Sequence, residues 1–198
     1  MTYDPIVLAS ASPRRSALLT QIGVAHEVLA ADLDEARLPG EPPHVYVERL
    51  ARDKALAARA ALGNADRVLL AADTSVVLGD EIFGKPEDEA HCVRMLMALS
   101  GRTHEVMTGI AVLAGETLLA DVNVSRVSFR ALDDEECRRY WRTGEPRGKA
   151  GGYAVQGFAA TFIERIDGSY SSVMGLPLFE TARLLAAAGV PAWRQEGA

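Results

Sequence analysis

Cysteine and aromatic residues are scarce in this sequence. The 198 residues include two cysteines, and aromatic side chains make up 6% of the chain. Cys92 and Cys137 are far apart and neither belongs to a C-x-x-C pair, so we expect free thiols in a reducing compartment rather than a disulfide framework. The low aromatic content also leaves little for platforms that stack nucleic-acid bases.

Long apolar runs and an excess of positive charge are missing as well. No apolar run approaches the ~18 residues needed to span a bilayer, and the amino end lacks a charged region followed by an apolar one. We therefore expect a cytoplasmic protein with no membrane partner. The formal net charge of -6 argues against a nucleic-acid partner, because nonspecific binders spread Lys and Arg along the phosphate backbone.

Several familiar catalytic motifs are absent too. The sequence has no H-E-x-x-H, no G-x-S-x-G and no dinucleotide-binding fingerprint, which excludes the zincin, serine-hydrolase and dinucleotide-binding interpretations. The nearest approach to a P-loop, at residues 144–150, is one residue short and lacks the Ser or Thr that would reach magnesium.

What the sequence does contain is an alternation of short apolar strands and amphipathic helices, which predicts the α/β class. A length of 198 residues favours a single domain over 1–198, or one domain with two lobes. Strands are expected at 6–9, 24–30, 68–72 and 158–166 and in hairpins at 76–83 and 104–129. Helices are expected at 16–22, 44–62, 87–99, 133–141 and 177–188.

The first strand, 6–9, leads directly into a helix start. Ser12 is placed as the N-cap and Pro13 as the first helical residue, so Arg14 and Arg15 fall at the second and third positions. Cations are disfavoured there by the helix dipole and the free N–H groups, unless an anion joins them. This pattern indicates a phosphate cradle; the alternative is a solvated pair of arginines beside an ordinary cap.

Further charged side chains occur at positions expected to face a ligand. Lys54 lies on the inner apolar stripe of the helix 44–62, where it either meets a phosphate or snorkels. Asp73 follows the strand 68–72, and ligands gather at the carboxyl ends of strands; a turn aspartate is the alternative. Lys85 lies between a glycine and a proline. The acidic cluster 32–35, which includes Glu35, either faces a cation or is solvated.

Together these groups suit a polyphosphate carried with a divalent metal, because cations neutralise phosphoryl oxygens while carboxylates hold a hard cation or activate water. The residues alone lead to a metal-assisted phosphate site and no further.

Motifs along the whole chain resemble, in order, those of the Maf family of nucleoside triphosphate pyrophosphatases. The motifs are Leu8-Ala9-Ser10-Ala11-Ser12-Pro13-Arg14-Arg15, Ala72-Asp73-Thr74, Gly84-Lys85-Pro86, S-G-R-T-H-E-V-M-T-G at 100–109, K-A-G-G-Y at 149–153, Gln156-Gly157, Gly168-Ser169-Tyr170 and G-L-P-L at 175–178.

The resemblance implies hydrolysis of a nucleoside triphosphate between its α and β phosphates, giving a monophosphate and pyrophosphate. It implies a catalytic group, in which Asp73 is the general base, and a divalent metal, Mg²⁺ or Mn²⁺, near Glu35 and Asp73. It also implies a mixed sheet with flanking helices, two lobes around a central cleft as in inosine triphosphatase-like proteins, and a homodimer. The catalytic residues implied are Asp73, Lys54 and Lys85, and the substrate-binding residues are Ser10, Ser12, Arg14, Arg15, Thr74 and Gln156.

Substrate choice depends on fewer positions. The family branch that prefers dTTP, UTP and related pyrimidines resembles this chain in having Arg14, Thr74 and Gln156, where the 7-methyl-GTP branch has an aromatic residue, Gln and Glu. We therefore expect Ser12 and Arg15 to hold phosphate and Arg14 to help choose the base. The alternatives are a pyrophosphatase for 7-methyl-GTP or other modified nucleotides, and a regulator of septum formation without enzymatic activity.

Overall fold

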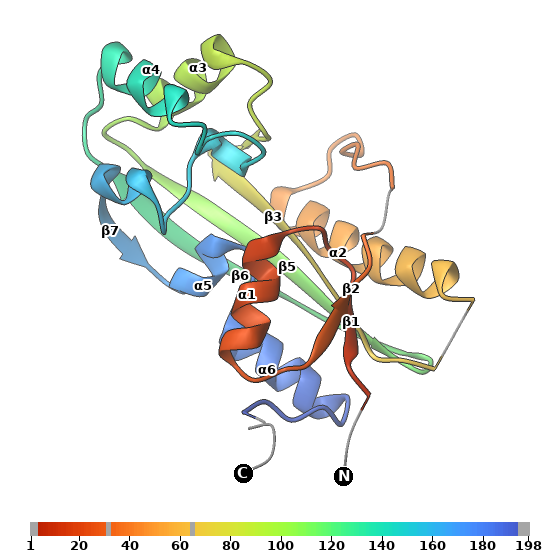
Figure 1. The fold of residues 1–198 in the computed structure, drawn as a ribbon. Helices are drawn as coiled ribbons and strands as arrows, with labels where there is room; N and C mark the ends of the chain where they lie inside the picture. Colours follow the sequence, from red (N-terminus) through yellow and green to blue (C-terminus); the bar gives the residue numbers. More distant parts are fainter. Residues whose placement is uncertain (1–3, 31–32, 64–65, 194–198) are drawn as a thin grey trace. The chain divides into compact units, whose positions relative to one another are not determined.

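The computed structural model describes residues 4–30, 33–63 and 66–193 (Figure 1). Among these residues, seven strands form one mixed sheet in the order β2-β1-β3-β5-β6-β7, with β4 paired to β3. Helices flank the sheet, which confirms the predicted α/β class. No helix in the described ranges is both long enough and apolar enough to cross a membrane.

The chain divides into two compact units, and it passes between them several times. Unit 1 comprises the described residues of 1–73, 108–123 and 175–198, and unit 2 comprises 74–107 and 124–174. Three strands run from one unit into the other: β3 (Leu69–Leu78), β5 (Thr103–Ala114) and β6 (Thr117–Phe129). The single domain expected over 1–198 stays a prediction.

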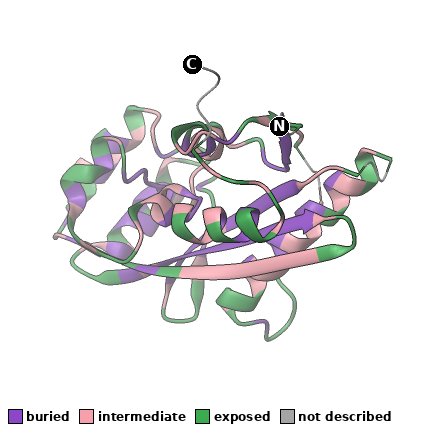
Figure 2. Cartoon of the chain, turned by 90° about the horizontal axis from the view of Figure 1, so that it is seen from below, coloured by how far each residue is buried: buried purple, intermediate pink, exposed green. Residues whose placement is uncertain are grey.

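Unit 1 holds parallel strands and three of the helices. Its own elements are β1 (Ile6–Leu8), α1 (Pro13–Gln21), β2 (His26–Val28), α2 (Pro43–Ala61) and α6 (Leu178–Ala187). Strand β1 pairs in parallel with both β2 and β3, so its backbone is bonded on both edges. Figure 2 shows buried residues along several strands, and helices that carry both exposed and partly buried residues.

Helix α2 packs against the sheet through an alanine face. Its buried residues Ala51, Ala55 and Ala58 form one cluster with apolar side chains of β1, β3 and β5. Small side chains let the helix come close to the strands. At Gly109 on β5 an added Cβ atom would lie 2.3 Å from the carbonyl oxygen of Val47, so only glycine fits beneath this turn of α2.

Unit 2 has its own core, built largely from two helices and a set of aromatic rings. Its further elements are β4 (Glu81–Phe83), α3 (Glu89–Leu99), α4 (Asp134–Arg142), the 3₁₀ helices η1 (Ala150–Gly152) and η2 (Phe158–Phe162), β7 (Ile163–Asp167) and α5 (Tyr170–Met174). Both long helices begin at aspartate caps: Asp88 accepts from the backbone N–H of His91, and Asp133 from that of Glu136.

The structure corrects several sequence-based expectations. The strand expected at 68–72 continues to Leu78, because the residues after Asp73 are mostly β-branched, which favours strand, and 75–77 are all buried. The strand expected at 158–166 begins with the 3₁₀ helix η2. The strand expected at 24–30 shortens to β2.

The close approach of α2 to β5 yields a test. Gly109→Ala should lower the free energy of unfolding by about 1–3 kcal/mol, because the added methyl group meets backbone that cannot rotate away. Urea titration monitored by circular dichroism measures the change.

Gly84→Ala is the matched control, because an added Cβ at Gly84 meets nothing within 4 Å. It should change the free energy of unfolding by no more than about 0.5 kcal/mol. Equal stability of the two variants would contradict the packing argument.

Candidate active site

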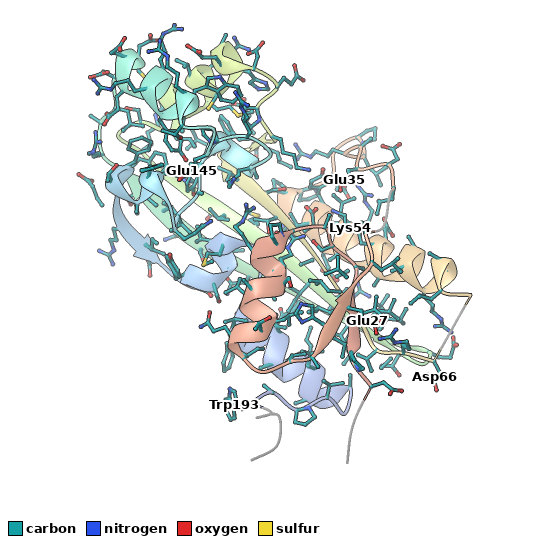
Figure 3. All side chains as sticks on the ribbon, in the orientation of Figure 1. Glu27, Glu35, Lys54, Asp66, Glu145 and Trp193 are labelled. Carbon is teal, nitrogen blue, oxygen red and sulfur yellow. The ribbon has the colours of Figure 1, made fainter. Side chains whose placement is uncertain are left out.

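The centre of the candidate site is the ammonium group of Lys54, which contacts two carboxylates. Its Nζ lies 2.7 Å from Asp73 Oδ1 and 2.6 Å from Glu35 Oε1. Lys54 and Asp73 are buried, whereas the side chain of Glu35 is 46% exposed. Figure 3 labels Lys54 and Glu35. The triad therefore joins a buried ion pair to a carboxylate that solvent reaches.

The positions of Lys54 on α2 and Asp73 on β3 explain how this group of three charged residues forms. Lys54 shares the inner face of α2 with Val47 and Leu50, as the helical spacing predicts, and all three are buried. Asp73 lies in the middle of β3 rather than after its end, so the expectation of a strand-end carboxylate was wrong. A mid-strand carboxylate that is itself buried needs a charged partner, and Lys54 supplies it.

A second cluster surrounds the start of α1. Arg15 donates from Nε to the carbonyl of Gly175 at 2.8 Å and from NH1 to the hydroxyl of Ser10 at 3.0 Å. The same hydroxyl accepts from the backbone N–H of Ser12 at 3.2 Å. Ser12 is the N-cap residue, but its side chain makes no cap hydrogen bond, so that part of the prediction was wrong. Ser10 therefore organises this turn.

The two clusters belong to one electrostatic neighbourhood. Burial lowers the pKa of Arg15, the charges of Asp73 and Glu35 raise it, and Arg14 lowers it. Burial also lowers the pKa of Arg14. Both arginines occupy the second and third positions of α1, as predicted, where the helix dipole adds positive potential. In unit 1, therefore, Arg15 at the start of α1 interacts electrostatically with the carboxylates of Asp73 and Glu35.

The loop that carries Glu35 is fixed by a network that the sequence analysis missed. Arg49 on α2 donates to both carboxylate oxygens of Glu41, at 2.6 and 2.8 Å, and to the carbonyl of Ala36 at 3.1 Å. The hydroxyl of Tyr46 donates to the carbonyl of Glu35 at 2.8 Å. Helix α2 therefore holds the loop at Glu35 and at its neighbour.

No local sequence pattern reveals the bond between Glu41 and Arg49. The two residues are eight positions apart, on opposite sides of the helix start, so neither helical spacing nor a capping motif links them. The one hint in the sequence is an acidic side chain directly before two prolines, Pro42 and Pro43, which fix the entry to α2.

Three predicted site residues belong to unit 2. Thr74 follows Asp73 on β3 and is partly buried, whereas Lys85 and Gln156 are exposed. The residue before Lys85, Gly84, accepts a hydrogen bond from the backbone N–H of Gly151 at 3.0 Å, which ties the Lys85 turn to η1. The other seven, Ser10, Ser12, Arg14, Arg15, Glu35, Lys54 and Asp73, all belong to unit 1.

A family model described as "Maf-like protein" matches residues 5–188. The chain belongs to the Maf family. The motifs noted along the sequence lie within this match, as do all ten predicted site residues.

Curated relatives of this Maf chain are similar along almost their whole length. A protein of Hahella chejuensis named "dTTP/UTP pyrophosphatase" is 48% identical over 95% of this chain and 94% of its own. Proteins of the same name from Saccharophagus degradans and Bordetella bronchiseptica are 49% and 50% identical, each over 96% of this chain and over 91% and 96% of their own lengths.

The network around Glu41 makes the acid stability of this Maf chain depend on Arg49. The hydrogen bond from Arg49 lowers the pKa of Glu41 to about 2. A carboxylate whose pKa falls on folding stabilises the fold above its unfolded pKa, about 4.3, and that stabilisation is lost as the pH falls toward 2. Arg49→Met should lower stability at pH 7 and flatten its decline below about pH 4.3, as measured by urea unfolding at a series of pH values.

Arg52→Met is the control for this experiment. It removes a pair with Glu48 on the same helix, in which both side chains are more than a third exposed. Its pH profile should run parallel to that of the wild type. If the Arg49→Met profile ran parallel as well, the role assigned to the bond with Glu41 would be wrong.

Proposed function

We propose that this Maf protein is a nucleoside triphosphate pyrophosphatase that hydrolyses dTTP and UTP to the monophosphate and pyrophosphate. The observation that carries the proposal is the contact of Lys54 with both Asp73 and Glu35, beside the arginines at the start of α1. The names of relatives that are about half identical support the same reaction and the same substrates.

Asp73 serves as the general base in this proposal. Its Oδ1 accepts from Lys54, which fixes the orientation of the carboxylate, and the carboxylate takes a proton from the attacking water. The water oxygen bonds to the α phosphorus, the bond from that phosphorus to the bridging oxygen breaks, and pyrophosphate leaves. Lys54 keeps the base in place, and its charge offsets the negative charge brought by the substrate.

Arg15 and its neighbours hold the phosphates. Its guanidinium is already oriented by the carbonyl of Gly175 and the hydroxyl of Ser10, so little side-chain entropy is lost when a phosphate binds. The N–H groups at the start of α1 add donors that point along the helix axis. The family resemblance also assigns Ser12 and Lys85 to the phosphates.

The donor set also fits a divalent metal, Mg²⁺ or Mn²⁺. Oxygens of Glu35 and Asp73, from two different segments, lie within 2.7 Å of one cationic nitrogen, so the fold already sets two carboxylates against a positive charge. Among the described residues no group of three or more His, Cys, Asp or Glu gathers to hold a metal. Mg²⁺ suits such a site, because it commonly takes one or two carboxylates and completes its shell with phosphate oxygens and water. When bound, the ion would polarise the phosphoryl oxygens.

Recognition of the nucleotide base, the pyrimidine ring, is assigned to Arg14, Thr74 and Gln156. An amide such as that of Gln156 both donates and accepts, which matches the edge of a uracil or thymine ring. A methylated guanine is cationic and would be better met by an aromatic face and a carboxylate. We further propose that the protein acts on free nucleotides in the cytoplasm, as its composition and charge lead us to expect, and that it forms a homodimer, as the family resemblance implies.

The proposed reaction is tested by pyrophosphate release. With Mg²⁺ or Mn²⁺ the protein should hydrolyse dTTP and UTP faster than 7-methyl-GTP. Asp73→Asn should lower kcat by about 100-fold or more, because an amide cannot take the proton from water.

Asp53→Asn, on α2 one residue before Lys54, makes the same chemical change at a carboxylate that is 42% exposed, and it should retain nearly full activity. Full activity of Asp73→Asn would refute the assignment of Asp73 as the general base. Faster turnover of 7-methyl-GTP would favour the modified-nucleotide alternative, and a wild type inert with every nucleotide would favour the non-enzymatic regulator.

The metal assignment is tested by stripping the protein with a chelator and adding Mn²⁺ back. Activity should be lost and then restored. Glu35→Gln should raise the Mn²⁺ concentration needed for half-maximal activity by about 10-fold, because one of two anionic ligands becomes neutral. Glu48→Gln, the same chemical change at a partly exposed carboxylate on α2, should leave the curve unmoved. If both variants matched the wild type, Glu35 would not be a metal ligand.

A further inference from the structure

We propose that Glu145 is a positioning residue for base selection, whose carboxylate fixes the turn that presents Gln156. The inference rests on the proposed function, in which Gln156 contacts the base of the nucleotide. All the residues that carry it belong to unit 2, and Glu145 is labelled in Figure 3.

The carboxylate of Glu145 collects three donors. Its Oε1 accepts from the hydroxyl of Tyr140 at 2.8 Å and from the backbone N–H of Ala159 at 3.2 Å, and its Oε2 accepts from the backbone N–H of Phe158 at 2.8 Å. The Tyr140 hydroxyl in turn accepts from the backbone N–H of Ala154 at 3.2 Å. The chain is therefore held two residues before Gln156 and two residues after it.

The backbone between these contacts forms a tight turn. The N–H of Gly157 donates to the carbonyl of Ala154 at 3.0 Å, which places Gln156 third in a four-residue turn. Residues 151–155 are buried, whereas Gln156 is exposed. The turn thus rises from the core of unit 2 and presents one amide side chain to solvent.

Gly157 shows how closely the carboxylate approaches this turn. A Cβ atom at Gly157 would lie 2.0 Å from Glu145 Oε2 and 2.4 Å from its Cδ. The backbone of Gly157, with φ -116° and ψ -148°, does not lie in the left-handed region that favours glycine. Glycine is needed here because of the side chain of Glu145.

A carboxylate is suited to this place and an amide is not. Both oxygens of Glu145 face donors, and an ionised carboxylate is an acceptor only. In Glu145→Gln one oxygen becomes an NH₂ group that opposes a donor, either the N–H of Phe158 or the hydroxyl of Tyr140. Burial and the hydrogen bond to Glu145 raise the pKa of Tyr140, so the phenol remains a donor at neutral pH.

The test compares kcat/KM for UTP and CTP, which differ at the ring edge that Gln156 would read. Glu145→Gln should lower the ratio of kcat/KM for UTP to kcat/KM for CTP by about 5-fold or more. The ratio should then approach that of Gln156→Ala, the variant in which the side chain that contacts the nucleotide base is absent. In the Gln156→Ala background, Glu145→Gln should change the ratio no further, because the two residues act through one contact. Glu164→Gln, an exposed change on β7, should keep the wild-type ratio.

Gly157→Ala is the second variant, in case Glu145→Gln folds poorly. Its methyl group displaces the carboxylate, so it should lower the ratio as Glu145→Gln does. In a Glu145→Ala background, where the clash is gone, adding Gly157→Ala should have little further effect.

Each outcome bears on a different claim. A wild-type ratio in Glu145→Gln and Gly157→Ala, even with reduced activity or stability, would overturn the inference and leave Glu145 a purely structural residue. An unchanged ratio in Gln156→Ala would overturn the inference as well, because it would show that Gln156 does not select the nucleotide base. A wild type that releases no pyrophosphate from any nucleotide would instead refute the proposed function, so the two failures are distinguishable.

Discussion

The rest of the candidate site depends on the ion pair between Lys54 and Asp73. Both side chains are buried, and a buried charge without a partner is strongly unfavourable, so helix α2 and strand β3 must keep the register that brings them together. The alanine face of α2 and the glycine at position 109 let the helix come close enough for a lysine side chain to reach the strand. The packing of the alanine face and the ion pair therefore favour the same position of α2 against β3.

The same ammonium links this buried pair to the surface. Glu35 joins Lys54 from a loop whose residues 34–40 are exposed, and the loop is fixed by hydrogen bonds from Arg49 and Tyr46 on α2. One helix thus supplies the central cation and the anchors for the carboxylate that reaches solvent. A phosphate that enters beside Arg15 would meet charges whose positions are set before it binds, which reduces the reorganisation required during the reaction.

Features that depend on local patterns were predictable from the sequence, and those that depend on distant partners were not. The inward position of Lys54 follows from helical spacing, and the aspartate cap at Asp133 follows from side-chain chemistry. The end of β3 was misplaced because an acidic residue looks like a strand end until its partner on another element is known. The carboxylates of Glu41 and Glu145 escaped notice for the same reason, since no helical or capping pattern links them to their side-chain donors Arg49 and Tyr140 or to the distant backbone N–H of Phe158.

The two carboxylates that the sequence did not reveal share one physical role. Glu41 and Glu145 both lie outside the helices and strands, and each accepts several hydrogen bonds there: Glu41 from Arg49 and the N–H of Leu38, and Glu145 from Tyr140 and the first N–H groups of η2. A loop held by charge-assisted hydrogen bonds loses its order when a single acceptor is removed, whereas a strand or helix is supported by many bonds of similar strength. Asp73, the proposed general base, is therefore held by a strand. Gln156, proposed to contact the base of the nucleotide, lies on a turn that the carboxylate of Glu145 holds. Under these two proposals, a change in this turn would alter substrate preference while the ion pair of Lys54 and Asp73 remains intact.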